Sequence, residues 1–65
     1  MKNNVRKLRK MHKLTQIELA DKTNVSRQTI IAIEKNKYDP SLKLAFKIAK
    51  LLKVSVENIF ILDDG

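Results

Sequence analysis

QIELADKTNVSRQTIIAIEK, residues 16–35, is the stretch of sequence that decides the fold. At its start, Thr15 and Glu18 have the spacing of a capping box, in which each side chain bonds the backbone N–H of the other residue. Asn24 then interrupts the apolar pattern, and asparagine tolerates the left-handed conformation in which helices end. Ser26, a favoured N-cap, opens a second helix. The stretch therefore predicts two short helices joined by a tight turn.

The spacing of small and apolar side chains predicts how these two helices pack. Two helices that cross steeply need a small side chain where they touch, and Ala20 meets that need. Val25, Ile30 and Ile33 then hold the second helix against the first. The second helix keeps an outward face made of Arg27, Gln28, Ile31, Ala32 and Lys35. This is the layout of a helix-turn-helix motif, whose second helix enters the major groove of DNA with its N-terminus first.

The outward face of the second helix carries side chains that can read base pairs. Arg27 can donate a bidentate pair of hydrogen bonds to guanine, and Gln28 can pair with adenine in a similar way. Ile31 and Ala32 are apolar, and they could meet thymine methyl groups, which are the apolar feature of the groove. The alternative interpretation is that Arg27 and Gln28 are only solvated helix residues. We favour base contact because the complete motif surrounds them.

The rest of the chain reads as three further helices without a linker or an internal repeat, so residues 1–65 are predicted to form a single domain. One helix spans about residues 4–12, another spans about residues 41–52, and a short one spans about residues 55–60. The apolar stripe of the longest helix is predicted to consist of Leu42, Ala45, Ile48, Ala49 and Leu52. The predicted fold class is all-α.

The composition of the 65-residue chain narrows the classes of function. The net charge is +7, and residues 1–13 hold six basic side chains and no acidic one, which suits a polyanionic partner. The chain has no Cys, and its single histidine, His12, has no partner at a metal-ligand spacing, so no metal or cofactor is predicted. One His and no convergent pair of carboxylates argue against an enzyme. The lack of Cys fits a cytoplasmic location, and no apolar run is long enough for a transmembrane helix.

Three runs of sequence carry a resemblance to a known family. They are LTQIELADKTNVSRQTIIAIEKNKYDPSL, LAFKIAKLL and VSVENIF, and together they cover most of residues 4–60. In their order and spacing they resemble the Cro and phage-repressor type of helix-turn-helix regulators, also called XRE-like. The resemblance implies a five-helix, lambda-repressor-like DNA-binding domain. The chain length and the run EKNKYDPSL are most similar to the small stand-alone repressors of the cytolysin-operon type.

The resemblance also implies roles for individual residues. Gln16, at the start of the first motif helix, would contact a phosphate group with the help of the helix dipole. The reading end of the second motif helix would consist of Ser26, Arg27, Gln28 and Thr29, with Ala32 as a further base-reading position. Contacts along the phosphate backbone would come from Lys35, Asn36, Lys37 and Tyr38. Arg9 and Glu34 would form an ion pair between the first and third helices. Asn24 and Asn36 stand where the family expects glycine.

The apolar run near the end of the chain predicts a dimer interface. Its members are Ile59, Phe60, Ile61 and Leu62. Five helices in so short a chain cannot bury all of this run, so it either folds back in part onto the core or pairs with a second copy. We favour a self-complementary interface between two copies related by a twofold axis. The run could also be extended and pair with Met1 to Asn3 in a short β ribbon.

These predictions combine into one functional hypothesis. The chain would be a transcriptional repressor that binds duplex DNA as a homodimer at a roughly palindromic operator, with no small-molecule ligand evident and its two reading helices about 34 Å apart. The alternative is a basic module that binds RNA or a membrane surface. RNA readers usually expose aromatic side chains for stacking, whereas Phe46 and Phe60 are expected to be buried or interfacial, which leaves only Tyr38.

Some charged and aromatic side chains have two interpretations. Lys43, Lys47 and Lys50 are more typical of a solvated helix face than of a second DNA surface. Tyr38 either packs on Pro40 or donates its hydroxyl group to a phosphate. The basic run at the start of the chain either steers the protein toward DNA or only increases its solubility.

Overall fold

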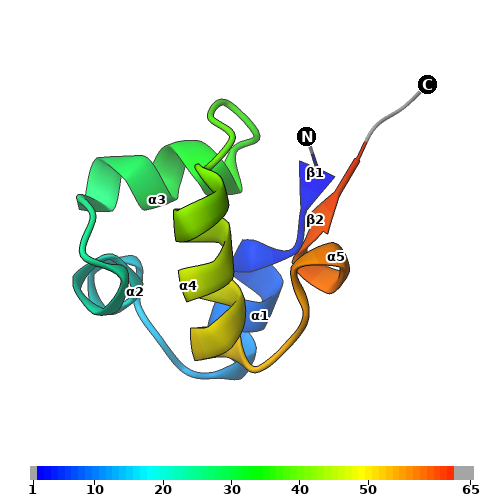
Figure 1. The fold of residues 1–65 in the computed structure, drawn as a ribbon. Coiled ribbons are helices and arrows are strands. Elements are labelled where there is room, and N and C mark those ends of the chain that lie inside the picture. Colours follow the sequence, from blue (N-terminus) through cyan, green and yellow to red (C-terminus); the bar gives the residue numbers. More distant parts are fainter. Residues whose placement is uncertain (1, 63–65) are drawn as a thin grey trace.

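The computed structural model of the protein describes residues 2–62. Figure 1 shows helices gathered around α4, with a two-stranded ribbon formed by segments from opposite ends of the chain. The elements in chain order are β1 (Lys2–Asn3), α1 (Val5–Met11), α2 (Gln16–Thr23), α3 (Arg27–Glu34), α4 (Leu42–Leu52), α5 (Val56–Ile59) and β2 (Phe60–Ile61). The five predicted helices are therefore present, and the fold is mainly α-helical as predicted.

Local hydrogen bonds set the ends of α2. The Thr15 hydroxyl accepts from the Glu18 N–H at 3.0 Å, and the Glu18 carboxylate accepts from the Thr15 N–H at 2.8 Å, so the predicted capping box is complete. Hydrogen bonds from the Thr15 backbone and then from its side chain lower the pKa of Glu18 below its ordinary value of 4.5. Asn24 ends the helix in the left-handed conformation with φ 62°.

Serine caps and residues with a positive φ also mark ends of the other helices, and two of these residues were not predicted. Ser26 and Ser41 cap α3 and α4, because their hydroxyl groups accept from the N–H groups three residues later. Asn36 has a positive φ, which fits its predicted place after α3. Lys13 and Lys53 also have positive φ values, 58° and 60°, which were not predicted because lysine is not a usual terminator.

The core lies between the inner faces of the helices. Its side chains with 0% exposure are Val5, Leu19, Ile30, Ile33, Ile48 and Ile59. The predicted stripe of α4 is wrong at one position, because Leu42 is 71% exposed and Leu44 is buried in its place. Leu44 lies on the same helix face as Ile48, at a separation of four residues, whereas Leu42 is rotated away from that face.

The predicted β ribbon is present, although Met1 lies outside the described residues. β1 and β2 are antiparallel, with Lys2 opposite Ile61 and Asn3 opposite Phe60. This pairing turns the backbone so that Ile59 and Phe60 point into the core, where they are 0% and 7% exposed. The interface prediction is therefore corrected for these two residues, which fold back onto the core. Only Ile61 and Leu62, 46% and 77% exposed, remain available to a partner.

Candidate nucleic-acid interface

α3 presents one face to solvent and holds the other against the core. Ile30 and Ile33 are fully buried, which fixes the rotation of the helix about its axis. As a consequence Arg27, Gln28 and Lys35 are exposed, and Ile31 and Ala32 are half-buried on the same outward side. The structure therefore brings together the outward face that the sequence predicts.

Two hydroxyl groups at the start of α3 are already engaged. The Ser26 hydroxyl accepts from the Thr29 N–H at 3.2 Å and also lies 3.0 Å from the Thr29 hydroxyl. Both side chains therefore hold the first turn of the helix. Arg27 and Gln28 are left as the exposed polar side chains between them.

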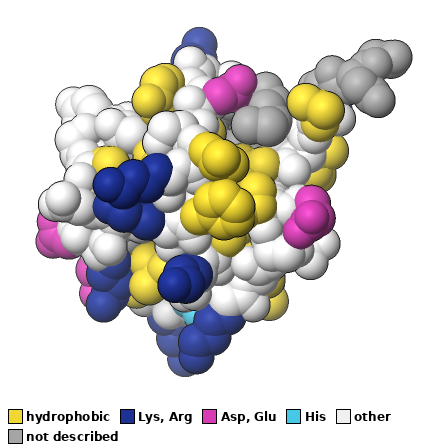
Figure 2. Space-filling view, in the orientation of Figure 1, with side chains coloured by type: hydrophobic (Ala, Val, Ile, Leu, Met, Phe, Trp, Pro, Cys, Tyr) yellow, Lys and Arg dark blue, Asp and Glu magenta, His cyan; other side chains and the backbone are white. Residues whose placement is uncertain are grey.

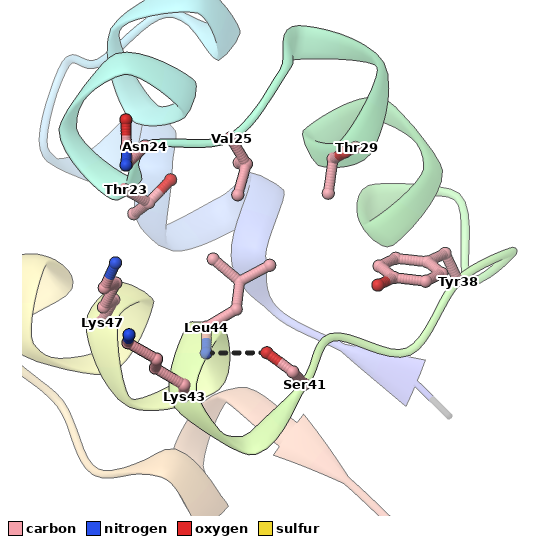
Figure 3. Close-up of a pocket in the computed structure, with 9 residues that line it drawn as sticks. All are labelled: Thr23, Asn24, Val25, Thr29, Tyr38, Ser41, Lys43, Leu44 and Lys47. Atoms are coloured by element: carbon pink, nitrogen blue, oxygen red, sulfur yellow. Dashed lines mark hydrogen bonds between the residues drawn. The ribbon is translucent and has the colours of Figure 1, made fainter.

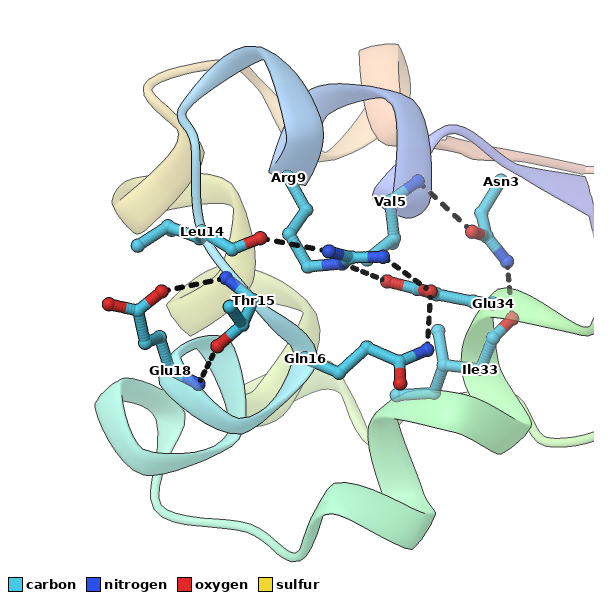
Figure 4. Close-up of polar contacts among 9 residues, drawn as sticks. All are labelled: Asn3, Val5, Arg9, Leu14, Thr15, Gln16, Glu18, Ile33 and Glu34. Atoms are coloured by element: carbon cyan, nitrogen blue, oxygen red, sulfur yellow. Dashed lines mark hydrogen bonds and ion pairs between the residues drawn. The ribbon is translucent and has the colours of Figure 1, made fainter.

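A buried polar network joins α1, α2 and α3 (Figure 4). Arg9 donates from Nε to Glu34 Oε2 at 2.7 Å and from Nη2 to Glu34 Oε1 at 3.2 Å, so the expected ion pair is present. The third guanidinium nitrogen of Arg9 donates to the Leu14 carbonyl at 2.8 Å. Because the two side chains are 9% and 4% exposed, this pair sets the position of α3 relative to α1.

Gln16 belongs to the same network. Its Nε2 donates to Glu34 Oε1 at 3.1 Å, so the amide group points at Glu34 and is not free of protein contacts. The predicted phosphate contact of Gln16 would thus use its remaining amide atoms or the backbone N–H at the start of α2. With the bonds from Arg9, the Glu34 carboxylate accepts three hydrogen bonds, and its negative charge is neutralised next to the outward face of α3.

Asn3 is a member of the site region that sequence reasoning missed. Its Nδ2 donates to the Ile33 carbonyl at 2.8 Å and to Asn36 Oδ1 at 3.0 Å, while its Oδ1 accepts from the Val5 N–H at 3.1 Å. One side chain therefore joins β1, the start of α1 and the end of α3. No local sequence signal could have indicated this role, because its partners on α3 lie at least 30 residues away.

A cleft lies on the α4 side of α3 (Figure 3). It has a volume of about 290 Å³, and Leu44 forms part of its lining. Thr29 and Tyr38 lie on one side, and Lys43 and Lys47 extend from α4 on the other. The Tyr38 ring is 49% exposed and its hydroxyl group points into the cleft. Lys35, Asn36 and Lys37, which are predicted to contact the phosphate backbone, are all exposed in the segment between α3 and Tyr38.

Other kinds of site find no support in the part of the chain that the structure describes. Within residues 2–62 no three His, Asp or Glu side chains come together as a group that could hold a metal ion. In the same residues no helix is both long and apolar enough to cross a membrane.

Comparison with known proteins identifies the family. The helix-turn-helix family model matches residues 5–59. The chain belongs to the helix-turn-helix family of XRE-like transcriptional regulators. This regulator is 66% identical over 64 residues to an HTH-type transcriptional regulator of Methanocaldococcus jannaschii. The alignment covers 98% of this chain and 97% of the relative. It is also 40% identical over 55 residues to the immunity repressor protein of Bacillus phage phi105, covering 85% of this chain and 38% of the repressor.

Solved structures agree with this family. The regulator is similar to the restriction-modification controller protein C.AhdI of Aeromonas hydrophila, with a TM-score of 0.78 and 27% sequence identity over 86% of this chain and 85% of the controller. The match supports the lambda-repressor-like fold predicted from the sequence. The helix-turn-helix regulator is thus a DNA-binding protein and not an enzyme.

Proposed function

We propose that this regulator represses transcription by binding a roughly palindromic operator as a homodimer, with α3 in the major groove. The observation that carries the proposal is the outward face of α3. Arg27 and Gln28 are exposed in its first turn. The Arg27 guanidinium can donate two hydrogen bonds to guanine, and the Gln28 amide can donate one to adenine and accept one from it. The buried ion pair of Arg9 with Glu34 holds this face in a fixed orientation.

An apolar surface on α4 and α5 supports the homodimer. Figure 2 shows hydrophobic side chains gathered in front of α4. Leu42, Phe46 and Leu62 are 71%, 55% and 77% exposed. Large exposed hydrophobic side chains that gather in one patch mark an interaction surface. Phe46 was expected to be buried or interfacial, and in the single chain it is not buried. We define these three residues, together with Val56 of α5, which lines the hollows beside them, as the α4–α5 apolar face.

The α4–α5 apolar face suits a second copy of this chain. Hollows of about 430 Å³ and 410 Å³ adjoin it and share Val56 and Glu57 in their linings. Lys50 and Glu57 line the same hollow, so the surface carries both charge signs at its rim. In a twofold interface each contact occurs twice, and a twofold axis roughly parallel to α4 would bring the basic rim of one copy opposite Glu57 of the other.

The same axis would give the DNA-binding geometry. It would leave both copies of α3 at the same end of the dimer, because α3 lies across one end of α4 in Figure 1. Two reading helices about 34 Å apart would then enter successive turns of the major groove. Repression follows as the outcome because a dimer bound near a promoter blocks RNA polymerase, and one relative is named an immunity repressor.

The proposal is tested by selecting bound DNA from a pool of random-sequence duplexes at two salt concentrations. We expect an inverted repeat whose half-sites lie about 10–11 base pairs apart. Arg27→Ala and Gln28→Ala should each relax the preference at defined positions of the half-site, by about 1–3 kcal/mol. Lys22→Ala, which removes an exposed cation at the C-terminal end of α2, should leave the selected sequence unchanged.

Two results would contradict this proposal. A pool that shows no motif, with equal binding to every duplex, would mean that α3 does not read bases. Preferential binding of single-stranded RNA over duplex DNA would favour the alternative module instead.

A further inference from the structure

A second cleft lies on the α1 side of α3, and four cationic side chains take part in its lining. It has a volume of about 320 Å³, and its floor includes the ion pair of Arg9 with Glu34. Three further cations line it: Arg6 and Lys10 from α1, and Lys35 from the end of α3. Four cations against one carboxylate leave a net charge of +3 in the lining.

Among the described residues, the three outer cations have no partner of their own. Within residues 2–62 neither an acidic side chain nor a hydrogen bond engages the side chain of Arg6, Lys10 or Lys35. The carboxylate of Glu34 does not neutralise them, because all three of its hydrogen bonds come from Arg9 and Gln16. Like charges gathered at one cleft repel one another, and an anion placed between them would relieve that repulsion.

The position of the cleft indicates which anion it takes. Ile31, on the outward face of α3, forms part of its lining, so the cleft opens beside the surface proposed to read bases. A neighbouring cleft shares Arg9 and Gln16 with it and continues past the start of α2 to Arg27. A helix seated in the major groove has a phosphate backbone along each side.

We propose that Arg6, Lys10 and Lys35 form a binding site for a backbone phosphate group of duplex DNA on the α1 side of α3. This inference rests on the proposed placement of α3 in the major groove. It extends the DNA contacts from the helix-turn-helix motif to α1. Such a contact carries no base preference and acts on every duplex alike.

α1 offers its own matched control. Lys7 is exposed and has the same charge, but it lies one residue further around the helix than Arg6 and does not line the cleft. Arg6→Gln and Lys10→Gln therefore remove a charge from the site, and Lys7→Gln removes the same charge from a different side of the same helix. Arg6→Lys retains the charge at the site.

The experiment measures the binding constant of the full chain as a function of salt, on the selected duplex and on a random-sequence duplex. The slope of log K against log salt is negative, and each of Arg6→Gln and Lys10→Gln should reduce its magnitude by up to about 0.9, the value for one phosphate contact, on both duplexes. Lys7→Gln and Arg6→Lys should keep the slope of the unmodified protein. Circular dichroism and thermal unfolding of each variant establish that it is folded.

Equal losses of slope for Lys7→Gln and Arg6→Gln would overturn the phosphate site, because the effect would then come from net charge alone. An unchanged slope for both Arg6→Gln and Lys10→Gln would overturn it as well. If the selection yields no motif but the two cleft variants still lower the slope on random-sequence DNA, the base-reading proposal fails and the phosphate site stands.

Discussion

The α2–α3 side of the molecule and its α4–α5 side are held together in different ways. On the α2–α3 side, polar side chains have specific partners: the capping box of α2, the ion pair of Arg9 with Glu34, and the Asn3 amide at the end of α3. On the α4–α5 side, apolar packing dominates, and Leu42 and Phe46 remain exposed. Hydrogen bonds depend on direction, whereas burial of apolar area does not. The polar contacts of the α2–α3 side therefore fix the orientation of α3, and the α4–α5 side keeps an exposed apolar surface for association.

The largest expected effect is the loss of the polar anchor. Glu34→Ala leaves the Arg9 guanidinium buried without its carboxylate, and the free energy of unfolding should fall by about 3–5 kcal/mol. Urea denaturation at one protein concentration measures this change. The double variant Arg9→Met with Glu34→Leu removes both charges and should recover most of the loss. If the double variant is as unstable as Glu34→Ala, the polar side does not depend on the pairing of the two charges.

The next effect tests the apolar side. Phe46→Glu places a charge in the α4–α5 apolar face, and the dissociation constant of the dimer should rise by at least about 100-fold, or about 2.7 kcal/mol. Analytical ultracentrifugation measures this constant. Met11→Glu is the control, because Met11 is 68% exposed on α1 and lies outside the apolar face. Equal behaviour of the two variants would show that the dimer does not use α4.

A smaller effect tests whether the polar side extends to the ribbon. Asn3→Ala removes the hydrogen bonds to the Ile33 carbonyl and from the Val5 N–H. The free energy of unfolding should therefore fall by about 1–2 kcal/mol. The comparison is Asn4→Ala, which removes one exposed side-chain bond of 3.3 Å to the Asn58 carbonyl and should cost less. Thermal unfolding of both variants decides the order. The same loss in each would mean that the Asn3 amide does not anchor α3.

The smallest effect is a pH dependence on the polar side. The pKa of Glu18 is lowered in the folded state, so its ionised form stabilises the fold above the ordinary value of 4.5. As the pH falls through that value the unfolded chain takes up the proton first, and this contribution is lost by the time the folded carboxyl group is protonated. Glu18→Gln should therefore flatten the dependence of unfolding free energy on pH as the pH falls from neutral through 4.5 and below. Denaturant unfolding along this pH series tests the sign, and a steeper curve for the variant would contradict it.

Much of the α2–α3 side could be predicted from the sequence because its signals are local. The capping box, Asn24 and Ser26 lie within one or two helical turns of the groups that they bond. The exposure of Arg27 and Gln28 followed from the same helical period that buries Ile30 and Ile33. Asn3 could not be placed, since its partners are distant in sequence.

The α4–α5 side was harder to predict because apolar residues are frequent in it. Leu42 and Leu44 are chemically identical, and only the placement of α4 against the rest of the core distinguishes them. Ile59 and Leu62 are likewise both large aliphatic residues, and the β1–β2 pairing decides that the Ile59 side chain turns inward while Leu62 stays exposed. The outward face of α3 was therefore predictable residue by residue, whereas the apolar face on α4 was found only in the structure.

The ribbon also has a consequence for the order of folding. Its pairing joins Lys2 to Ile61, and the Asn4 N–H donates to the Ile59 carbonyl at 2.8 Å, so these contacts close nearly the whole chain into one loop. Closing so long a loop costs more chain entropy than forming the α2–α3 turn, which makes the ribbon a late event in folding. It should also be the first part of the native structure to open, and in native-state hydrogen exchange the Asn4 amide should exchange before the Leu19 amide in α2. Each opening of the ribbon would release the Asn3 side chain from the end of α3, so the reading helix would lose one of its restraints on the timescale of that local unfolding.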